Sequence, residues 1–140
     1  MHFKKYPKYK PSRIEWLGKI PEKWEISKLK YLSSIVTGGT PSRKNEENYS
    51  NDGGVPWAKP SDLGTFKAIV DSREKLTQKG VRLARKVPVN SSLVCGIGSI
   101  GKFGLAGINL TTNQQVNSLV FNHKIDSKFG FYLIVATKNY

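Results

Sequence analysis

Cysteine and histidine are scarce in this sequence, which has one cysteine, Cys95, and two histidines, His2 and His123, among 140 residues. A single cysteine cannot form an intrachain disulfide, which favours a reducing compartment. The spacing of these three residues provides neither a metal site nor a nucleophile paired with a base. We therefore expect no disulfide, no metal ion and no cofactor.

Long hydrophobic runs are also missing from the chain. No stretch approaches the roughly 20 consecutive apolar residues that span a bilayer. The basic N-terminus is not followed by the apolar segment of a secretion signal. We therefore expect a cytoplasmic protein with no membrane partner.

Acidic residues are few, and their arrangement does not indicate catalysis. The chain has 10 Asp and Glu, of which Asp62, Asp71 and Glu74 are the central ones. Glu74 directly precedes Lys75, without the one-residue gap of a nuclease Glu-x-Lys element, and the chain has no phosphate-binding loop and no Asn-Pro-Pro-aromatic element of an amino-methyltransferase. We predict no catalytic residue; a pocket that gathers Asp62, Asp71 and a lysine of shifted pKa would favour an enzyme instead.

Residues 96–101 read Gly-Ile-Gly-Ser-Ile-Gly and match the dinucleotide-binding pattern GxGxxG after a candidate strand. The segment that follows, residues 102–107, is rich in glycine and β-type residues and opposes the helix that such a site needs. The next acidic residue, Asp126, comes about five residues too late for the fingerprint. We interpret the segment as a β-turn in which Gly98 and Gly101 let the backbone approach another surface.

Positive charge is what the sequence has in excess. The 23 Lys and Arg outnumber the acids and give a formal net charge of +13. A field of that sign attracts polyanions, so DNA or RNA is the leading partner class, and an acidic protein or a membrane surface is a weaker one. A basic protein with no such partner is the remaining alternative.

The length and a hydrophobic share of 38% are typical of one folded domain. Residues 1–12 are rich in Lys, Tyr and Pro without periodicity, and they are predicted to form a flexible basic arm. The domain is then predicted to occupy residues 13–140. Trp16 and Trp24 flank a Gly and a Pro, which indicates an irregular segment held to the core by aromatic burial.

A short helix is predicted next, followed by a loop. Ser27 is expected to cap a helix that ends near Ile35, because Leu29, Leu32 and Ile35 have roughly helical spacing. Residues 42–54 are polar and end in Asn-Asp-Gly-Gly, which predicts a long loop.

Short strands dominate the rest of the chain. A strand is predicted over residues 55–59, and a helix over residues 77–86 that Pro88 ends. Short β-type runs, separated by Gly- or Asn-rich turns, follow at residues 93–95, 103–106 and 116–121. Ser127 is expected to cap a last helix. This pattern predicts an α+β fold with a curved, mostly antiparallel β region, or a partial barrel, and a few short helices.

The order of several motifs is familiar. The chain opens with Tyr9-Lys10-Pro11-Ser12-x-Ile14-Glu15-Trp16-Leu17-Gly18-x-Ile20-Pro21-x-x-Trp24. The further motifs are Leu29, Thr37-Gly38-Gly39-Thr40-Pro41, Val55-Pro56-Trp57, Asp62-Leu63, Lys79-Gly80, Val87-Pro88, Gly98-Ser99-Ile100-Gly101 and Asn113-Gln114. In this order they resemble the target recognition domain of a type I restriction-modification specificity subunit, over essentially the whole chain.

The resemblance implies a non-catalytic α/β module whose curved β region presents loops to the DNA major groove. In that family a complete subunit has two such domains, separated by long helices, and each domain reads half of a split site. This sequence would supply one domain and ends before any long helix, so the resemblance implies a fragment or truncated copy of a longer subunit. The implied partners are double-stranded DNA and, in the full-length context, modification (methyltransferase) and restriction subunits.

Several basic and polar side chains are candidates for contact with DNA. Arg43 and Lys44 lie in the predicted loop, Lys59 follows Trp57 at a strand end, and Lys102 follows the glycine turn. Each can meet a phosphate or a guanine, and a merely solvated side chain is the alternative at each basic position. The DNA-binding candidates are Arg43, Lys44, Lys59, Ser99, Lys102 and Gln115.

Other motif residues are assigned to support of the fold. Asn113, Gln114 and Gln115 can pair with adenine, but local backbone support is the preferred role of Asn113 and Gln114. Trp16, Trp24 and Trp57 are expected in the core rather than as stacking platforms. The structural candidates are Trp24, Gly38, Pro41, Trp57, Gly98, Gly101, Asn113 and Gln114.

The hypothesis from sequence is therefore sequence-specific binding of duplex DNA without catalysis. A basic RNA-binding module is the first alternative, and it would need exposed aromatic residues on a sheet face. An enzyme with an unrecognised active site is the second.

Overall fold

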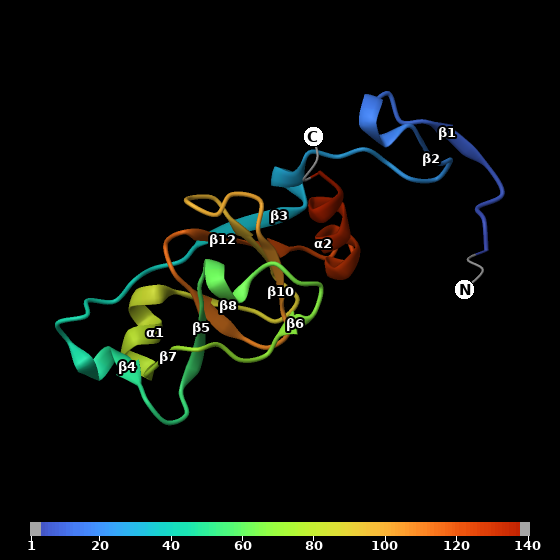
Figure 1. The fold of residues 1–140 in the computed structure, drawn as a ribbon. Helices are drawn as coiled ribbons and strands as arrows, with labels where there is room; N and C mark the ends of the chain where they lie inside the picture. Colours follow the sequence, from blue (N-terminus) through green and yellow to red (C-terminus); the bar gives the residue numbers. More distant parts are fainter. Residues whose placement is uncertain (1–3, 138–140) are drawn as a thin grey trace.

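Figure 1 shows the computed structural model of the chain, which describes residues 4–137. In this part of the chain the strands form one two-stranded sheet and two five-stranded sheets. The helices are α1 (Gln78–Ala84), α2 (Ser127–Ala136) and the short 3-10 helices η1 (Glu15–Leu17), η2 (Leu29–Tyr31), η3 (Glu46–Asn48) and η4 (Pro60–Asp62). The strands are β1 (Tyr9–Pro11), β2 (Lys19–Pro21), β3 (Ser33–Thr37), β4 (Tyr49–Ser50), β5 (Val55–Ala58), β6 (Ala68–Ile69), β7 (Lys75–Leu76), β8 (Lys86–Val87), β9 (Ser92–Cys95), β10 (Phe103–Ala106), β11 (Leu110–Thr112) and β12 (Val116–Phe121).

The first five-stranded sheet has the order β3-β12-β9-β10-β6, with β9 antiparallel to both of its neighbours. β6 is the exception, because it joins the edge parallel to β10. Leu93 of β9 and Val116 of β12 are buried in the same apolar cluster. α2 contacts β9 and β12, and a Cβ added at Gly130 would lie 2.5 Å from the ring of Phe121. The missing side chain at Gly130 therefore lets α2 lie directly on the sheet.

The second five-stranded sheet has the order β4-β7-β5-β11-β8. Its central strand, β5, is antiparallel to β7 and parallel to β11. Four buried residues of this part, Trp57, Leu76, Val81 and Ala84, form a second apolar cluster. α1 supplies two of them and begins at its N-cap residue Thr77, whose hydroxyl accepts a hydrogen bond from the amide of Gly80 at 3.3 Å. α1 therefore packs against β7 and β11 of this sheet.

Two consecutive glycines after β3 connect the two sheets. The amide of Gly38 donates to the carbonyl of Val116 at 3.1 Å, and the amide of Gly39 donates to the carbonyl of Thr112 at 2.9 Å. Val116 belongs to the first sheet and Thr112 to the second. A Cβ added at Gly38 would lie 2.2 Å from the carbonyl oxygen of Asn113, so the backbones meet where no side chain fits.

The predicted helix beginning at Ser27 is wrong. The chain forms only the three-residue η2 there, and residues 33–37 form β3 instead. β3 pairs with β12 over five residues, from Ser33 opposite Phe121 to Thr37 opposite Asn117. Ile35, Val36 and Thr37 are β-branched and suit a strand, so pairing with β12 outweighs the helical spacing of the leucines.

The N-terminal prediction also needs correction. Residues 9–11 do not belong to a flexible arm, because β1 pairs antiparallel with β2. Trp24 is 36% exposed and Trp16 is 37% exposed, so neither lies in the core. Trp24 instead meets the ring of Phe129 on α2 edge-on, with centroids 5.0 Å apart. Residues 1–3 of the predicted arm lie outside the described part.

Most of the other predicted elements are confirmed. The α+β class with mostly antiparallel pairing is confirmed, and β10 and β12 have the predicted bounds. The strand at residues 55–59 and the helix at residues 77–86 are each found within one or two residues of their predicted ends. α2 forms as expected, although Asp126 caps it instead of Ser127. The predicted loop at residues 42–54 contains η3 and β4.

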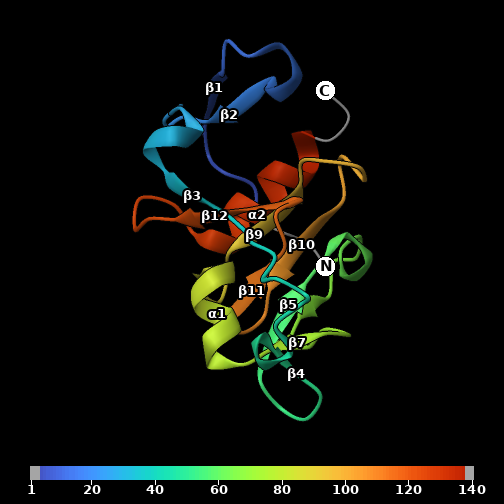
Figure 2. The same cartoon turned by 90° about the vertical axis from the view of Figure 1, so that its left-hand side faces the viewer.

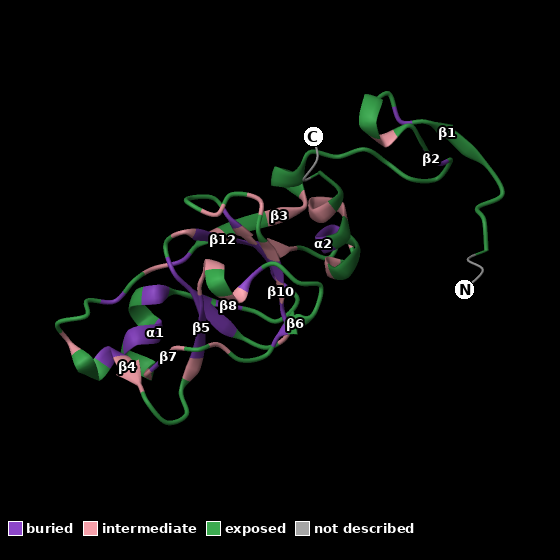
Figure 3. Cartoon of the chain, in the orientation of Figure 1, coloured by how far each residue is buried: buried purple, intermediate pink, exposed green. Residues whose placement is uncertain are grey.

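Burial follows this arrangement (Figure 3). The buried residues gather in the two five-stranded sheets and α1, whereas the β1–β2 pair is largely exposed. Figures 1 and 2 place the β1–β2 pair at one end of the molecule and β4 at the other. Within residues 4–137, no helix has the length and apolar character needed to cross a membrane.

Substitution of Gly38 tests the connection between the sheets. Gly38→Ala should lower the free energy of unfolding by about 3 kcal/mol, the upper end of the usual cost of overpacking, because its Cβ meets backbone atoms. Gly53→Ala is the control, since a Cβ there meets nothing within 4 Å and only its φ of +74° is unfavourable. That change should cost about 1 kcal/mol. Urea unfolding measures both, and equal costs would contradict this role of Gly38.

Candidate nucleic-acid interface

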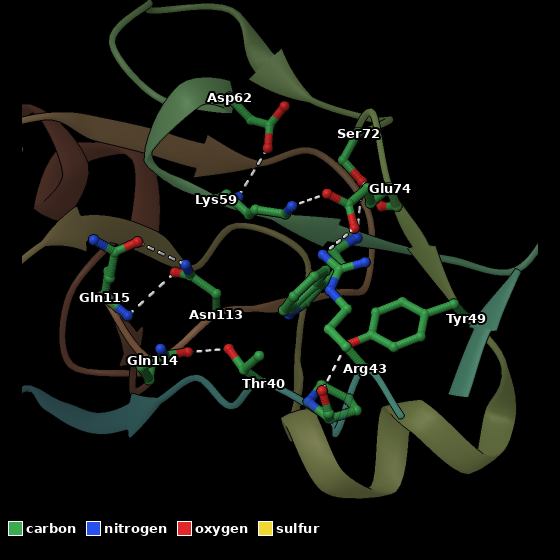
Figure 4. Close-up of polar contacts among 12 residues, drawn as sticks. Thr40, Arg43, Tyr49, Lys59, Asp62, Ser72, Glu74, Asn113, Gln114 and Gln115 are labelled. Carbon is green, nitrogen blue, oxygen red and sulfur yellow. Dashed lines mark hydrogen bonds and ion pairs between the residues drawn. The ribbon is translucent and has the colours of Figure 1, made fainter. Parts of the chain in front are cut away.

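Two of the predicted basic residues, Arg43 and Lys59, meet at a single acid (Figure 4). A guanidinium nitrogen of Arg43 lies 2.5 Å from Glu74 Oε2, and the ammonium of Lys59 donates to Glu74 Oε1. The guanidinium also lies over the Tyr49 ring, 4.4 Å from its centroid. The Trp57 ring has Lys59 Nζ 4.7 Å from its centroid and the Arg43 guanidinium carbon 5.4 Å from it. Two cations thus share one carboxylate above two aromatic rings.

Lys59 is held in place through both its backbone and its side chain. Its backbone amide donates to Asp62 Oδ2 at 2.8 Å, which fixes the start of η4 directly after β5. Burial and then the charge of Arg43 lower the pKa of Lys59 below its ordinary value. A lysine in this setting has lost part of its hydration and interacts more strongly with an anion than a fully exposed lysine does.

Glu74 is positioned by the strand that carries Trp57. The backbone amide of Trp57 donates to the carbonyl of Glu74 at 3.0 Å and to Ser72 Oγ at 2.8 Å. Ser72 Oγ donates in turn to the carbonyl of Glu74 at 2.5 Å. The indole nitrogen of Trp57 donates to the carbonyl of Gly39 at 3.1 Å, so the buried Trp57 joins the acid to the glycines between the sheets.

The predicted glycine turn joins β9 to β10, and Lys102 directly after it contacts η4. Gly98 and Gly101 have φ values of +78° and +84°, as a turn of this kind requires. Lys102 Nζ donates to the carbonyl of Pro60 at 3.3 Å, which ties the base of the hairpin to η4. Its tip is exposed and includes Ile100, which is 78% exposed. Lys102 and Lys59 therefore both meet the start of the same short 3-10 helix.

The turn at residues 113–115 lies beside these groups (Figure 4). Asn113 is buried, accepts from the amide of Gln115 at 3.1 Å and donates through its side chain to Gln115 Oε1 at 2.9 Å. The hydroxyl of Thr40 donates to Gln114 Oε1. Gln115 Nε2 faces the hairpin, 3.2 Å from where a Cβ at Gly98 would be. The side chain of Asn113 thus makes its contacts within the turn. The Nε2 donors of Gln115 lie beside the hairpin turn.

The other candidates are distributed as follows. Pro41 is buried, and its carbonyl accepts from the hydroxyl of Tyr49 at 2.6 Å. Lys44 is exposed on the loop after β3, and Ser99 is half-buried in the hairpin turn. Trp24 lies against Phe129 of α2.

Glu74 is the residue that sequence reasoning missed as part of this site. It lies 31 positions after Arg43 in the chain. In the sequence, Glu74 stands out only as an acid that lacks the spacing of a nuclease Glu-x-Lys element. The one available signal is its isolation between Arg73 and Lys75 in a strongly basic chain. Among residues 4–137, no three His, Cys, Asp or Glu side chains lie close enough to hold a metal ion.

Comparison with known proteins gives a consistent result. Residues 21–140 match the family model for the type I restriction modification DNA specificity domain. The chain is 32% identical over 121 residues to the type I restriction enzyme MjaIX specificity subunit of Methanocaldococcus jannaschii, with 84% of this chain and 28% of that protein aligned. It is 32% identical over 103 residues to the HindI specificity subunit of Haemophilus influenzae, with 72% of this chain and 22% of that protein aligned.

Solved structures share the fold. The crystal structure of the HsdS subunit from Thermoanaerobacter tengcongensis aligns with a TM-score of 0.70 at 15% identity, over 86% of this chain and 29% of that one. The S subunit from M. genitalium aligns with a TM-score of 0.53 at 16% identity, over 79% of this chain and 26% of that one. The chain thus spans less than a third of the length of each of these relatives. From the match over residues 21–140, the chain belongs to the family of type I restriction-modification DNA specificity domains.

Proposed function

We propose that this chain binds double-stranded DNA in a sequence-specific manner and reads one half of a bipartite site for a type I restriction-modification complex. The observation that carries the proposal is the grouping of Arg43, Lys59, Lys102 and Gln115 on one surface, around η4 and two turns. Cations grouped in this way can neutralise phosphates, and an amide beside them can read a base edge. Membership of the specificity-domain family supports the same function.

The two kinds of contact fall to different residues. Lys59 and Lys102 both meet the start of η4 and are assigned to phosphates, which set the position and orientation of the domain on the duplex. Lys44 and Arg43 extend this basic surface along the loop after β3. Gln115 and Ser99 lie at the adjoining turns and are assigned to base edges, since a Gln amide pairs with adenine in the major groove.

Catalysis is assigned to other chains. In this proposal the domain supplies target specificity, and the modification and restriction subunits carry out methylation and cleavage. The chain covers less than a third of its relatives, so a complete subunit has room for a second recognition domain that reads the other half-site. Residues 13–140 would then form one domain of such a subunit.

The alternatives from sequence have less support. An RNA-binding sheet needs aromatic residues on an exposed face. The exposed aromatic side chains among the described residues lie outside the two five-stranded sheets. An enzyme would gather Asp62 and Asp71 at a lysine of shifted pKa, but Asp71 pairs with Lys75 at 3.1 Å instead of with Lys59.

Selection from a random pool tests the proposed function. Duplexes with a randomised centre are incubated with the domain at low and at moderate salt, and the bound fraction is sequenced. Because base contacts add to the phosphate contacts, a contiguous motif of a few base pairs should be enriched and should persist at moderate salt. Binding without any enriched motif would reduce the domain to a basic surface and contradict the proposal.

Two substitutions separate the two kinds of contact. Lys102→Ala should weaken binding to all duplexes alike and reduce the slope of log K against log salt by about one. Gln115→Ala should leave the slope unchanged and relax the preference at one position of the enriched motif, a loss of about 1–3 kcal/mol of discrimination. Fluorescence anisotropy with matched and mismatched duplexes measures both effects.

Lys19→Ala is the control for the lost charge. Lys19 is exposed on β2, at the far end of the molecule from β4. A slope change equal to that of Lys102→Ala would show that only net charge matters and would refute the assigned surface.

A further inference from the structure

Arg43, Lys59 and Glu74 form a cluster with more charge than a structural ion pair requires. Glu74 gives one carboxylate oxygen to each cation, Oε2 to Arg43 and Oε1 to Lys59. The side chain of Arg43 is 58% exposed, whereas that of Lys59 is 25% exposed. The cluster therefore retains one net positive charge and presents it toward solvent through Arg43.

The three side chains have few ways to rearrange. The Arg43 guanidinium stands on the rings of Tyr49 and Trp57, and the Trp57 ring is fixed by its hydrogen bond to Gly39. The backbone of Glu74 is bound to the amide of Trp57. Both cations are thus held at a fixed spacing around one bound anion, which is the arrangement that a phosphate of DNA would require.

We propose that Glu74 is an internal substitute for a DNA phosphate: it aligns Arg43 and Lys59 in the free domain, and a backbone phosphate replaces it on binding. The inference rests on the proposed DNA-binding function. Carboxylate and phosphate oxygens accept the same charge-assisted hydrogen bonds from guanidinium and ammonium groups, so the exchange keeps both cations paired. A phosphate gains these contacts only by displacing the carboxylate.

This exchange lowers the affinity for arbitrary DNA. Each cation that meets a phosphate elsewhere on a protein surface gives up water and counterions, whereas Arg43 and Lys59 must also give up Glu74. The displaced carboxylate then remains close to the phosphate and repels it. Glu74 therefore acts against non-specific binding, and the correct site repays this loss through its base contacts.

Two other roles of Glu74 give different results on substitution. If Glu74 only stabilised the fold, Glu74→Gln would loosen Arg43 and Lys59 above the Trp57 ring and weaken DNA binding. If Glu74 accepted a hydrogen bond from a cytosine amino group, the same change would alter base preference at one position without a change in salt dependence. Of these three roles, only that of a phosphate substitute predicts that Glu74→Gln binds DNA more tightly and with a stronger dependence on salt.

The experiment compares four proteins on one fluorescein-labelled duplex of arbitrary sequence, over 50–200 mM KCl, by fluorescence anisotropy. Glu74→Gln should bind about tenfold more tightly than the parent at the lowest salt, and its slope of log K against log salt should be steeper by about one. Glu74→Asp keeps the carboxylate and should follow the parent. Glu47→Gln removes a carboxylate from the exposed pair with Lys79, which contacts neither ring, and should also follow the parent.

The outcomes separate this inference from the proposed function. If the parent binds DNA and Glu74→Gln matches Glu47→Gln, or binds more weakly, the inference is overturned while the proposed function stands. If neither the parent nor Glu74→Gln binds the duplex at any salt concentration, both are overturned. A gain in affinity that is confined to Glu74→Gln supports the inference, because loss of a structural contact cannot produce it.

Discussion

The close approach of backbones at Gly38 and Gly39 is the constraint on which the rest of this structure depends. The two glycine amides donate to carbonyls that belong to different five-stranded sheets. A Cβ at either position would lie within 2.6 Å of a backbone oxygen. The carbonyl of Gly39 also accepts from the Trp57 indole and so fixes the ring on which the charged cluster rests. Packing at the sheet junction thus sets the geometry of a surface site.

The proposed function requires a chain with a net charge of +13 to discriminate between DNA sequences, and electrostatics accounts for how it would do so. Exposed cations bind any polyanion, and their contribution falls as salt rises. In this domain, two of the cations are paired with Glu74 and lie over aromatic rings. In our proposal this pairing limits their contribution to binding at arbitrary sites, and specificity depends on the side chains at the hairpin and at the turn of residues 113–115.

The parts of the fold that sequence predicts are those with strong local signals. β10 and β12 are β-type runs between turns, and α1 lies between a threonine cap and Pro88. The sequence does not predict β3 because Leu29, Leu32 and Ile35 have helical spacing, and pairing with β12, 80 to 88 residues away, decides the outcome. The candidate site divides in the same way. Asn113 makes the contacts within its turn that the local sequence favours, whereas the role proposed for Glu74 depends on contacts 15 and 31 residues away in sequence.

The measurement that tests the central claim most directly is a nuclear magnetic resonance titration of the ¹⁵N-labelled domain with a duplex that carries its enriched motif. The account predicts that amide shifts concentrate in residues 40–44, 59–62, 96–102 and 113–115. These segments are the loop after β3, η4 with Lys59, the hairpin turn and the turn before β12. Shifts concentrated in β1, β2 and α2, with these segments unchanged, would contradict it.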